Sequence, residues 1–143
     1  MEMFKDILAC VDVGDEESAE KVINAALEVT VSDDTLHVMC VVPDYGKSIV
    51  GTFFPPEHEK DMIEHATEAL HAFTAKHVPE NTRIQHITAH GNIYEEIIAA
   101  ANTCNADLIV VGSHRPALKD YLLGPNAARV VRHARQSVLV VRY

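Results

Sequence analysis

The sequence predicts an α/β protein in which helices cover both faces of a parallel sheet. Segments of helical period alternate along the chain with short apolar runs typical of strands. Runs such as residues 7–11 and 108–111 are apolar at successive positions, as in central strands that are buried on both faces. Turn residues (Gly, Pro, Asp) follow these runs. Five strands and four helices joined by right-handed crossovers would form a three-layer sandwich.

The first half of the chain contains two expected strands and two expected helices. Residues 4–13 form the first strand, and Asp15 can cap the helix that follows, which ends near residue 31. Residues 35–42 form the second strand, which ends at Pro43. The long irregular stretch after it, residues 43–56, is of a length that is usually functional or mobile. A helix over residues 57–77 has an inward apolar stripe made of Met62, Ala66, Ala69, Leu70 and Phe73.

The second half continues the alternation. Residues 83–89 alternate as a short edge strand does, and Asn92 with Glu95 is typical of a helix start. A fourth strand over residues 108–112 precedes a polar loop, and a fifth spans residues 137–142. The helix between them should turn four residues inward: Ala127, Val130, Val131 and Ala134. Residues 1–143 contain no repeat or linker, so we expect a single domain.

Composition excludes several classes of function. The chain of 143 residues carries a net charge of −9, which disfavours binding to nucleic acid or to an anionic membrane. No apolar run is long enough to span a bilayer, and the acidic N-terminus does not resemble a signal peptide, so we expect a cytoplasmic protein without membrane insertion. The three cysteines form neither a disulfide framework nor a zinc motif.

Residues 107–126 predict an anion site. An apolar run ends at Gly112, a polar loop follows, and Gly124, Pro125 and Asn126 begin the last helix. A helix start that follows glycine presents free N–H groups and the positive end of the helix dipole, which bind phosphate. Residues 104–143 hold six Arg or Lys and two Asp, a net of +4, so the preceding residues carry −13. A local basic field in an acidic chain favours a small anionic ligand.

The expected crevice lies at the carboxyl ends of the strands, where ligands bind in doubly wound sheets. Asp12 and Gly112 both occupy such ends, and they line one crevice if the first and fourth strands are neighbours. Asp12 could instead only cap the next helix, but its position beside a glycine turn favours ligand contact. A Ser113–His114–Asp12 triad is rejected because Ser113 and His114 are adjacent and no Gly-x-Ser-x-Gly elbow is present. We expect no catalytic and no metal-binding residues.

The residues around this crevice, with further motifs downstream, resemble the universal stress protein family over essentially the whole chain. The matching motifs are Gly-Ser-His-Arg-Pro (112–116), Tyr-Leu-Leu-Gly (121–124), Asn-Ala (126–127), Val-Val-Arg-His-Ala (130–134) and Val-Leu-Val-Val-Arg (138–142). The resemblance implies a Rossmann-like sheet of order 3-2-1-4-5 that binds ATP or AMP, with Mg²⁺ held mainly by the phosphates. It also implies a homodimer through residues 138–142. Some members of the family act beside membrane transporters, and the protein partner of this chain is left open.

The resemblance also assigns roles to single residues. Asp12 would bind the ribose, and Gly112 would let the ligand approach the backbone. Adenine would lie against Cys10, Val11 and Val41, with Val111 beneath. The nucleotide-binding set is completed by residues of the loop and of the last helix start: His114, Arg115, Gly124, Pro125 and Asn126.

The chain departs from the family pattern Gly-x2-Gly-x9-Gly-Ser/Thr. Arg115 stands at the second glycine, one residue is missing before Gly124, and Pro125 replaces the hydroxyl residue. Because Pro125 has neither N–H nor hydroxyl, up to two phosphate donors are lost. Asn126 and Arg115 are the residues that could replace them.

Three functions remain open at this point. The chain has no Walker motif, no carboxylate cluster near Gly112 and no evident base, so a nucleotide-binding regulatory or stress-response protein is favoured over an enzyme. A slow ATPase or nucleotidyl-transfer enzyme on the same fold is the first alternative. A dimeric interaction module that has lost its nucleotide is the second, which Pro125 keeps open.

Overall fold

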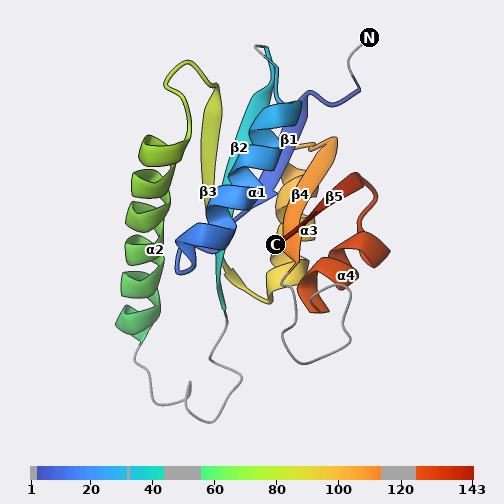
Figure 1. Ribbon diagram of the computed structural model, residues 1–143. Helices are drawn as coiled ribbons and strands as arrows, with labels where there is room; N and C mark the ends of the chain where they lie inside the picture. The colour runs from blue at the N-terminus through green and yellow to red at the C-terminus, as the bar shows by residue number, and fades with distance from the viewer. Residues whose placement is uncertain (1–2, 32, 44–55, 114–124) are drawn as a thin grey trace.

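The computed structural model describes residues 3–31, 33–43, 56–113 and 125–143. Strands and helices alternate throughout (Figure 1), and the five strands form one sheet in the order β3-β2-β1-β4-β5, with every neighbouring pair parallel. The elements are β1 (Asp6–Cys10), α1 (Glu16–Val29), β2 (Thr35–Pro43), α2 (Pro56–His77), β3 (Ile84–Gly91), α3 (Ile93–Thr103), β4 (Leu108–Ser113), α4 (Pro125–His133) and β5 (Ser137–Arg142). The predicted fold class and strand order are confirmed.

Two layers of helices enclose the sheet. Ile7 and Ala9 of β1 pack with α1 and α2 in one core cluster, whereas Leu8 packs with α3 and α4 in the other. Side chains of a strand alternate between the two faces, so both faces of β1 are buried, which is why its sequence is apolar at successive positions. Among the described helices, none is long and apolar enough to cross a membrane.

Local signals placed the helix starts correctly. The Asp15 carboxylate accepts a hydrogen bond from the Ser18 N–H, and the Asn92 side chain accepts one from the Glu95 N–H. The first strand, however, covers only Asp6–Cys10 and not residues 4–13, because the chain turns as soon as it passes the sheet. The expected inward positions of Val131 (45% exposed) and Ala69 (exposed) were wrong. Both lie on helices that cover the sheet beside its edge strands, where a narrower stripe of the helix meets the core.

The winding of the sheet reverses beside β1. One crossover leads from β1 to β2, and later crossovers build β4 and β5 on the other side of β1. Ile7 pairs with Leu108, so β1 and β4 are neighbours as the crevice hypothesis requires. Helix α1, which follows β1, and helix α4, which follows β4, lie on opposite faces of the sheet, and a depression at its carboxyl edge is expected between them.

Candidate functional site

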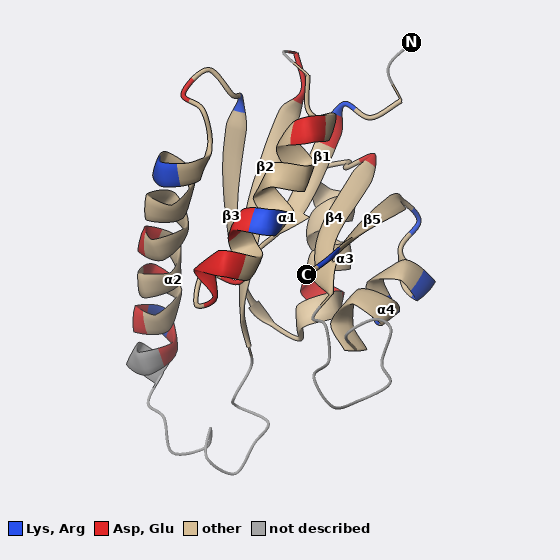
Figure 2. Ribbon diagram, viewed as in Figure 1, with Lys and Arg blue, Asp and Glu red and all other residues tan. Residues whose placement is uncertain are grey.

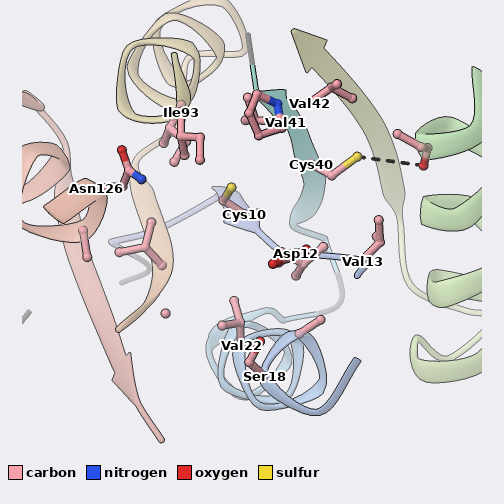
Figure 3. A pocket seen from close by; sticks show the side chains of 18 of the residues that line it. Cys10, Asp12, Val13, Ser18, Val22, Cys40, Val41, Val42, Ile93 and Asn126 are labelled. Atoms are coloured by element: carbon pink, nitrogen blue, oxygen red, sulfur yellow. Dashed lines mark hydrogen bonds between the residues drawn. The ribbon is translucent and has the colours of Figure 1, made fainter. Parts of the chain in front are cut away.

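A cavity of about 850 Å³ lies at this carboxyl edge. The ends of β1, β2 and β4 form its floor, and α1, α2, α3 and the start of α4 supply its walls. Figure 3 shows Cys10 and Asp12 near its centre, Ser18 and Val22 of α1 on one side, and Asn126 across from Val13. The volume is within the range of about 300–1,000 Å³ that is usual for small-molecule sites.

The structure brings most of the predicted site residues to this one cavity. Those that line it are Cys10, Val11, Asp12, Val41, Val111, Gly112, Pro125 and Asn126. His114, Arg115 and Gly124 lie outside the described residues. Several lining residues were not predicted, namely Ser18, Asp61, His65 and Tyr143. Asp61 and His65 are four apart on α2 and so share a helix face, but no local signal indicates that this face borders the crevice.

Asp12 is held in place by its own turn. Its Oδ1 accepts a hydrogen bond of 2.9 Å from the Gly14 N–H, and its carbonyl oxygen accepts one of 3.0 Å from the Asp15 N–H. The side-chain cap of α1 is Asp15, so the alternative that Asp12 caps this helix is wrong. The Asp12 carboxylate is exposed at the cavity, where Oδ2 can accept a hydrogen bond from a ligand hydroxyl.

The floor around Asp12 is apolar. Val11 and Val111 are each 4% exposed, and Val41 and Ile93 are half-buried. Burial, together with the nearby Cys40 and Asp12, raises the pKa of the Cys10 thiol to about 12. Cys10 therefore stays a neutral thiol at physiological pH and serves as a small apolar surface. A flat apolar group such as a heterocycle suits this floor.

Gly112 is covered on the side where a side chain would project. A Cβ atom there would lie 2.7 Å from Tyr143 Cε1 and 2.9 Å from Val22 Cγ2. The space that the missing side chain leaves is thus filled by the Tyr143 ring and by α1. The sequence indicated that Gly112 matters, but a lone aromatic residue after the last strand gave no signal of this contact.

The helix starts at the cavity differ in charge. Helices α1 and α3 have side-chain caps and two glutamates each in the first turn. Helix α4 has no acidic residue in its first turn and carries Arg132 and His133 in its last. Figure 2 shows acidic residues along α1 and α2 and basic residues around α4. Of these three helix starts, that of α4 is the one whose field favours an anion.

A cluster of histidine, cysteine or acidic side chains would indicate a metal site. Within the part of the chain that the structure describes, no three His, Cys, Asp or Glu side chains gather closely enough to hold a metal ion.

The sheet order and the cavity at its reversal point define the class: a Rossmann-like α/β protein with a cavity at the carboxyl edge of its strands, which is where sheets of this kind bind small ligands. Residues 3–142 match the Universal stress protein family, and the chain belongs to that family. It is 30% identical over 142 residues to universal stress protein G of Escherichia coli O157:H7, covering 98% of this chain and 100% of that protein.

Solved structures share the fold. The hypothetical protein MJ0577, described in a structure-based assignment of biochemical function, superposes with a TM-score of 0.82 at 24% identity, covering 99% of this chain and 97% of that one. A universal stress protein crystallised in complex with cAMP superposes with a TM-score of 0.59 at 20% identity, covering 98% of both chains.

Proposed function

We propose that this protein is an adenine-nucleotide-binding universal stress protein that acts as a regulatory or stress-response module. The observation that carries the proposal is that Asp12, an apolar floor and the start of α4 meet in one cavity. These are the three chemistries that a nucleotide needs: an acceptor for sugar hydroxyls, a surface for the base and a positive field for phosphate. A structural relative in complex with cAMP supports the choice of an adenine nucleotide, and we propose ATP or AMP here.

The base and the sugar occupy the part of the cavity between β1 and β2. Adenine packs against Val41 and Val11, with Cys10 and Val111 completing the apolar contact. The ribose lies at Asp12, whose exposed oxygen accepts from a sugar hydroxyl. Both contacts are common to adenosine, AMP and ATP, so this half of the cavity supplies affinity that does not depend on the number of phosphates.

The phosphates occupy the part between Gly112 and α4. Asn126 lines this part, whereas Pro125 offers neither N–H nor hydroxyl. His114, Arg115 and Gly124 complete the phosphate contacts in the proposal, on the strength of the sequence alone. Mg²⁺, when present, is held mainly by the phosphates. Pro125 is also the one feature that favours a second function, an interaction module without nucleotide.

Regulation would act through assembly. β5 is the last strand in the sheet order, so no described strand pairs with its outer side, and its four central residues are half-buried. An apolar strand edge of this kind is stabilised by two-fold pairing with a second copy. We propose a single-domain cytoplasmic protein that forms a homodimer through residues 138–142 and signals to a protein partner, for which a transporter is one candidate.

Isothermal calorimetry with ATP, AMP and adenosine tests this proposal. We expect one site per chain, with phosphate release far below the roughly 10 per second of a typical enzyme. Mass spectrometry of small molecules that co-purify with the protein identifies the resident nucleotide. No heat and no thermal shift at millimolar nucleotide, with or without Mg²⁺, would favour the interaction module, and phosphate release at an enzymatic rate would favour the ATPase.

A further inference from the structure

Val131 is an exposed apolar residue on the flank of α4 that points away from α3. Ala127 and Val130 of α4 are buried against the sheet, at 4% and 0% exposed. Arg129 lies on another side of the helix, with its guanidinium carbon 5.3 Å from the centre of the Tyr94 ring in α3. Because successive helical residues are turned by about 100° in one sense, the flank reached after Arg129 and Val130 is the one opposite to α3. Val131 lies on this flank and is 45% exposed.

This flank of α4 faces the free edge of the sheet. In the strand order β3-β2-β1-β4-β5, α3 packs on β2 and β3, whereas α4 packs on β4 and β5. The side of α4 away from α3 therefore faces beyond β5, at the end of the sheet that lies opposite to α2 in Figure 1. Val138 and Val140 of β5 pack in the same core cluster as α4, and both are half-buried. We call the apolar group of Val131, Val138 and Val140 the edge surface.

A second copy of the chain is the partner that fits the edge surface. No described strand pairs with the outer side of β5, and antiparallel pairing with a second β5 would satisfy the N–H and C=O groups of this edge. The two-fold axis of such a pair is perpendicular to the sheet, so both α4 helices would lie on the same face and the two edge surfaces would meet. The edge surface carries no charge, so it is compatible with its own copy.

The same pairing brings like charges together. Residues 125–143, which span α4 and β5, contain four arginines and no Asp, Glu or Lys. Figure 2 shows basic residues around α4. Exposed charges more than about 10 Å apart are largely screened at ~0.1 M salt, so this local positive charge, and not the net charge of −9, acts across the edge. Phosphates bound at the start of α4 would offset the positive charge of each copy.

We propose that a second copy packs against the edge surface, and that nucleotide phosphate at the start of α4 strengthens this dimer by offsetting the positive charge that the two copies bring together. The inference rests on the proposed function, in both its nucleotide and its dimer. Helix α4 is the link, because its first residues line the cavity and Val131 lies further along the same helix. Binding and assembly are reciprocal, so the dimer binds AMP more tightly than the monomer does. Adenosine, which has no phosphate, binds both alike.

Val131→Lys tests the edge surface. The lysine would have to be buried against its own copy, so the dissociation constant of the dimer, measured by sedimentation of a dilution series, should rise by about tenfold or more. The matched control is Val31→Lys, the same change at a valine that follows α1 and is 54% exposed, which should leave the dimer unaltered. Both variants should bind adenosine as the wild type does, because neither valine lines the cavity. An unchanged dimer in Val131→Lys would overturn the proposal.

Saturating AMP and adenosine test the effect of phosphate on the wild-type dimer. At ~0.1 M salt, AMP should lower the dissociation constant of the dimer by about fivefold or more, whereas adenosine should leave it unchanged. This difference should vanish at ~1 M salt, where the screening length is about 3 Å. Equal effects of AMP and adenosine, or an AMP effect that persists at ~1 M salt, overturn the coupling alone. A wild type that binds none of these ligands, or that stays monomeric, overturns the proposed function and, with it, the coupling.

Discussion

His86 of β3 stacks on His71 of α2, with ring centroids 3.8 Å apart and planes inclined by 25°. His86 Nε2 also lies 2.7 Å from Thr74 Oγ1, so the imidazole links the edge strand to the helix that covers it. Burial lowers the pKa of His86 below its ordinary value of 6.5, and the charge of the neighbouring His71 lowers it further. The packing of β3 against α2 therefore favours a neutral His86.

This contact predicts a loss of stability in mild acid. The unfolded chain titrates His86 near pH 6.5, whereas the folded chain does so at lower pH, so the unfolded state binds more protons in between. The contribution of His86 to the free energy of unfolding should be fully present above pH 6.5. It should be lost as the pH falls from there through the lowered pKa of the folded state. Urea unfolding at pH 7.5 and pH 5 should show a smaller loss in His86→Gln than in the wild type.

Other histidines also make the stability of the protein depend on pH, so a control variant is necessary. His77 and His90 face Glu16 at 3.1 Å and Glu59 at 3.6 Å, and protonation strengthens such pairs. The quantity to compare is therefore the loss of stability between pH 7.5 and pH 5 in His86→Gln and in the wild type. The exposed His133→Gln serves as the control. An identical pH dependence in all three proteins would contradict the role of His86.

The close contact at Gly112 predicts a cost for any side chain there. In Gly112→Ala the Tyr143 ring or Val22 must shift, because the new atom would lie under 3 Å from both. We expect a loss of about 1–3 kcal/mol in the free energy of unfolding, measured with urea. Gly14→Ala is the matched control, since its Cβ would meet only Asp12 Oδ1, at 3.2 Å.

A double variant separates crowding from other effects. If the cost arises from the ring, Gly112→Ala combined with Tyr143→Ala should cost less than the sum of the two single changes. Strict additivity would show that Gly112 and Tyr143 act independently.

The edge position of β5 predicts that Val140→Lys converts a dimer into a monomer. A lysine among half-buried strand residues places a charge on the edge that a second copy would pair with. Light scattering should fall from twice the chain mass to the 15.8 kDa of one chain, while circular dichroism confirms that the variant stays folded. The control Val31→Lys changes an exposed valine (54%) after α1 and should leave the mass unaltered. A monomeric wild type at micromolar concentration would refute the dimer.

Arg115 supplies a prediction from sequence alone, as it lies outside the described residues. It is the basic residue nearest to Gly112 along the loop. Arg115→Ala should weaken ATP by about five- to thirtyfold and leave adenosine nearly unchanged, because a guanidinium contact to the β- or γ-phosphate is lost. Arg132→Ala, an exposed change in the last turn of α4, is the control. Loss of both ligands in calorimetry would indicate a disturbed loop and no phosphate contact.

Much of the architecture was predictable because its signals are local. Alternating periodicity identified five strands and four helices, and the caps at Asp15 and Asn92 follow from side chains that bond N–H groups three residues away. Asp12 and Gly112 could be placed in one crevice because both end apolar runs, and parallel strands end at the same edge. The strand order came from the family resemblance, and periodicity alone would not have supplied it.

The remaining features depend on packing between residues far apart in the chain. Periodicity marks Val131 as apolar, but only the position of α4 beside the edge strand leaves it 45% exposed. Asp61 reaches the cavity because α2 covers β2 and β3, and no local signal records that placement. The contact of Tyr143 with Gly112 joins residues 31 positions apart through the register of β4 with β5. Local propensity is set by neighbours within a few residues, whereas such contacts are set by how whole elements fill the space between them.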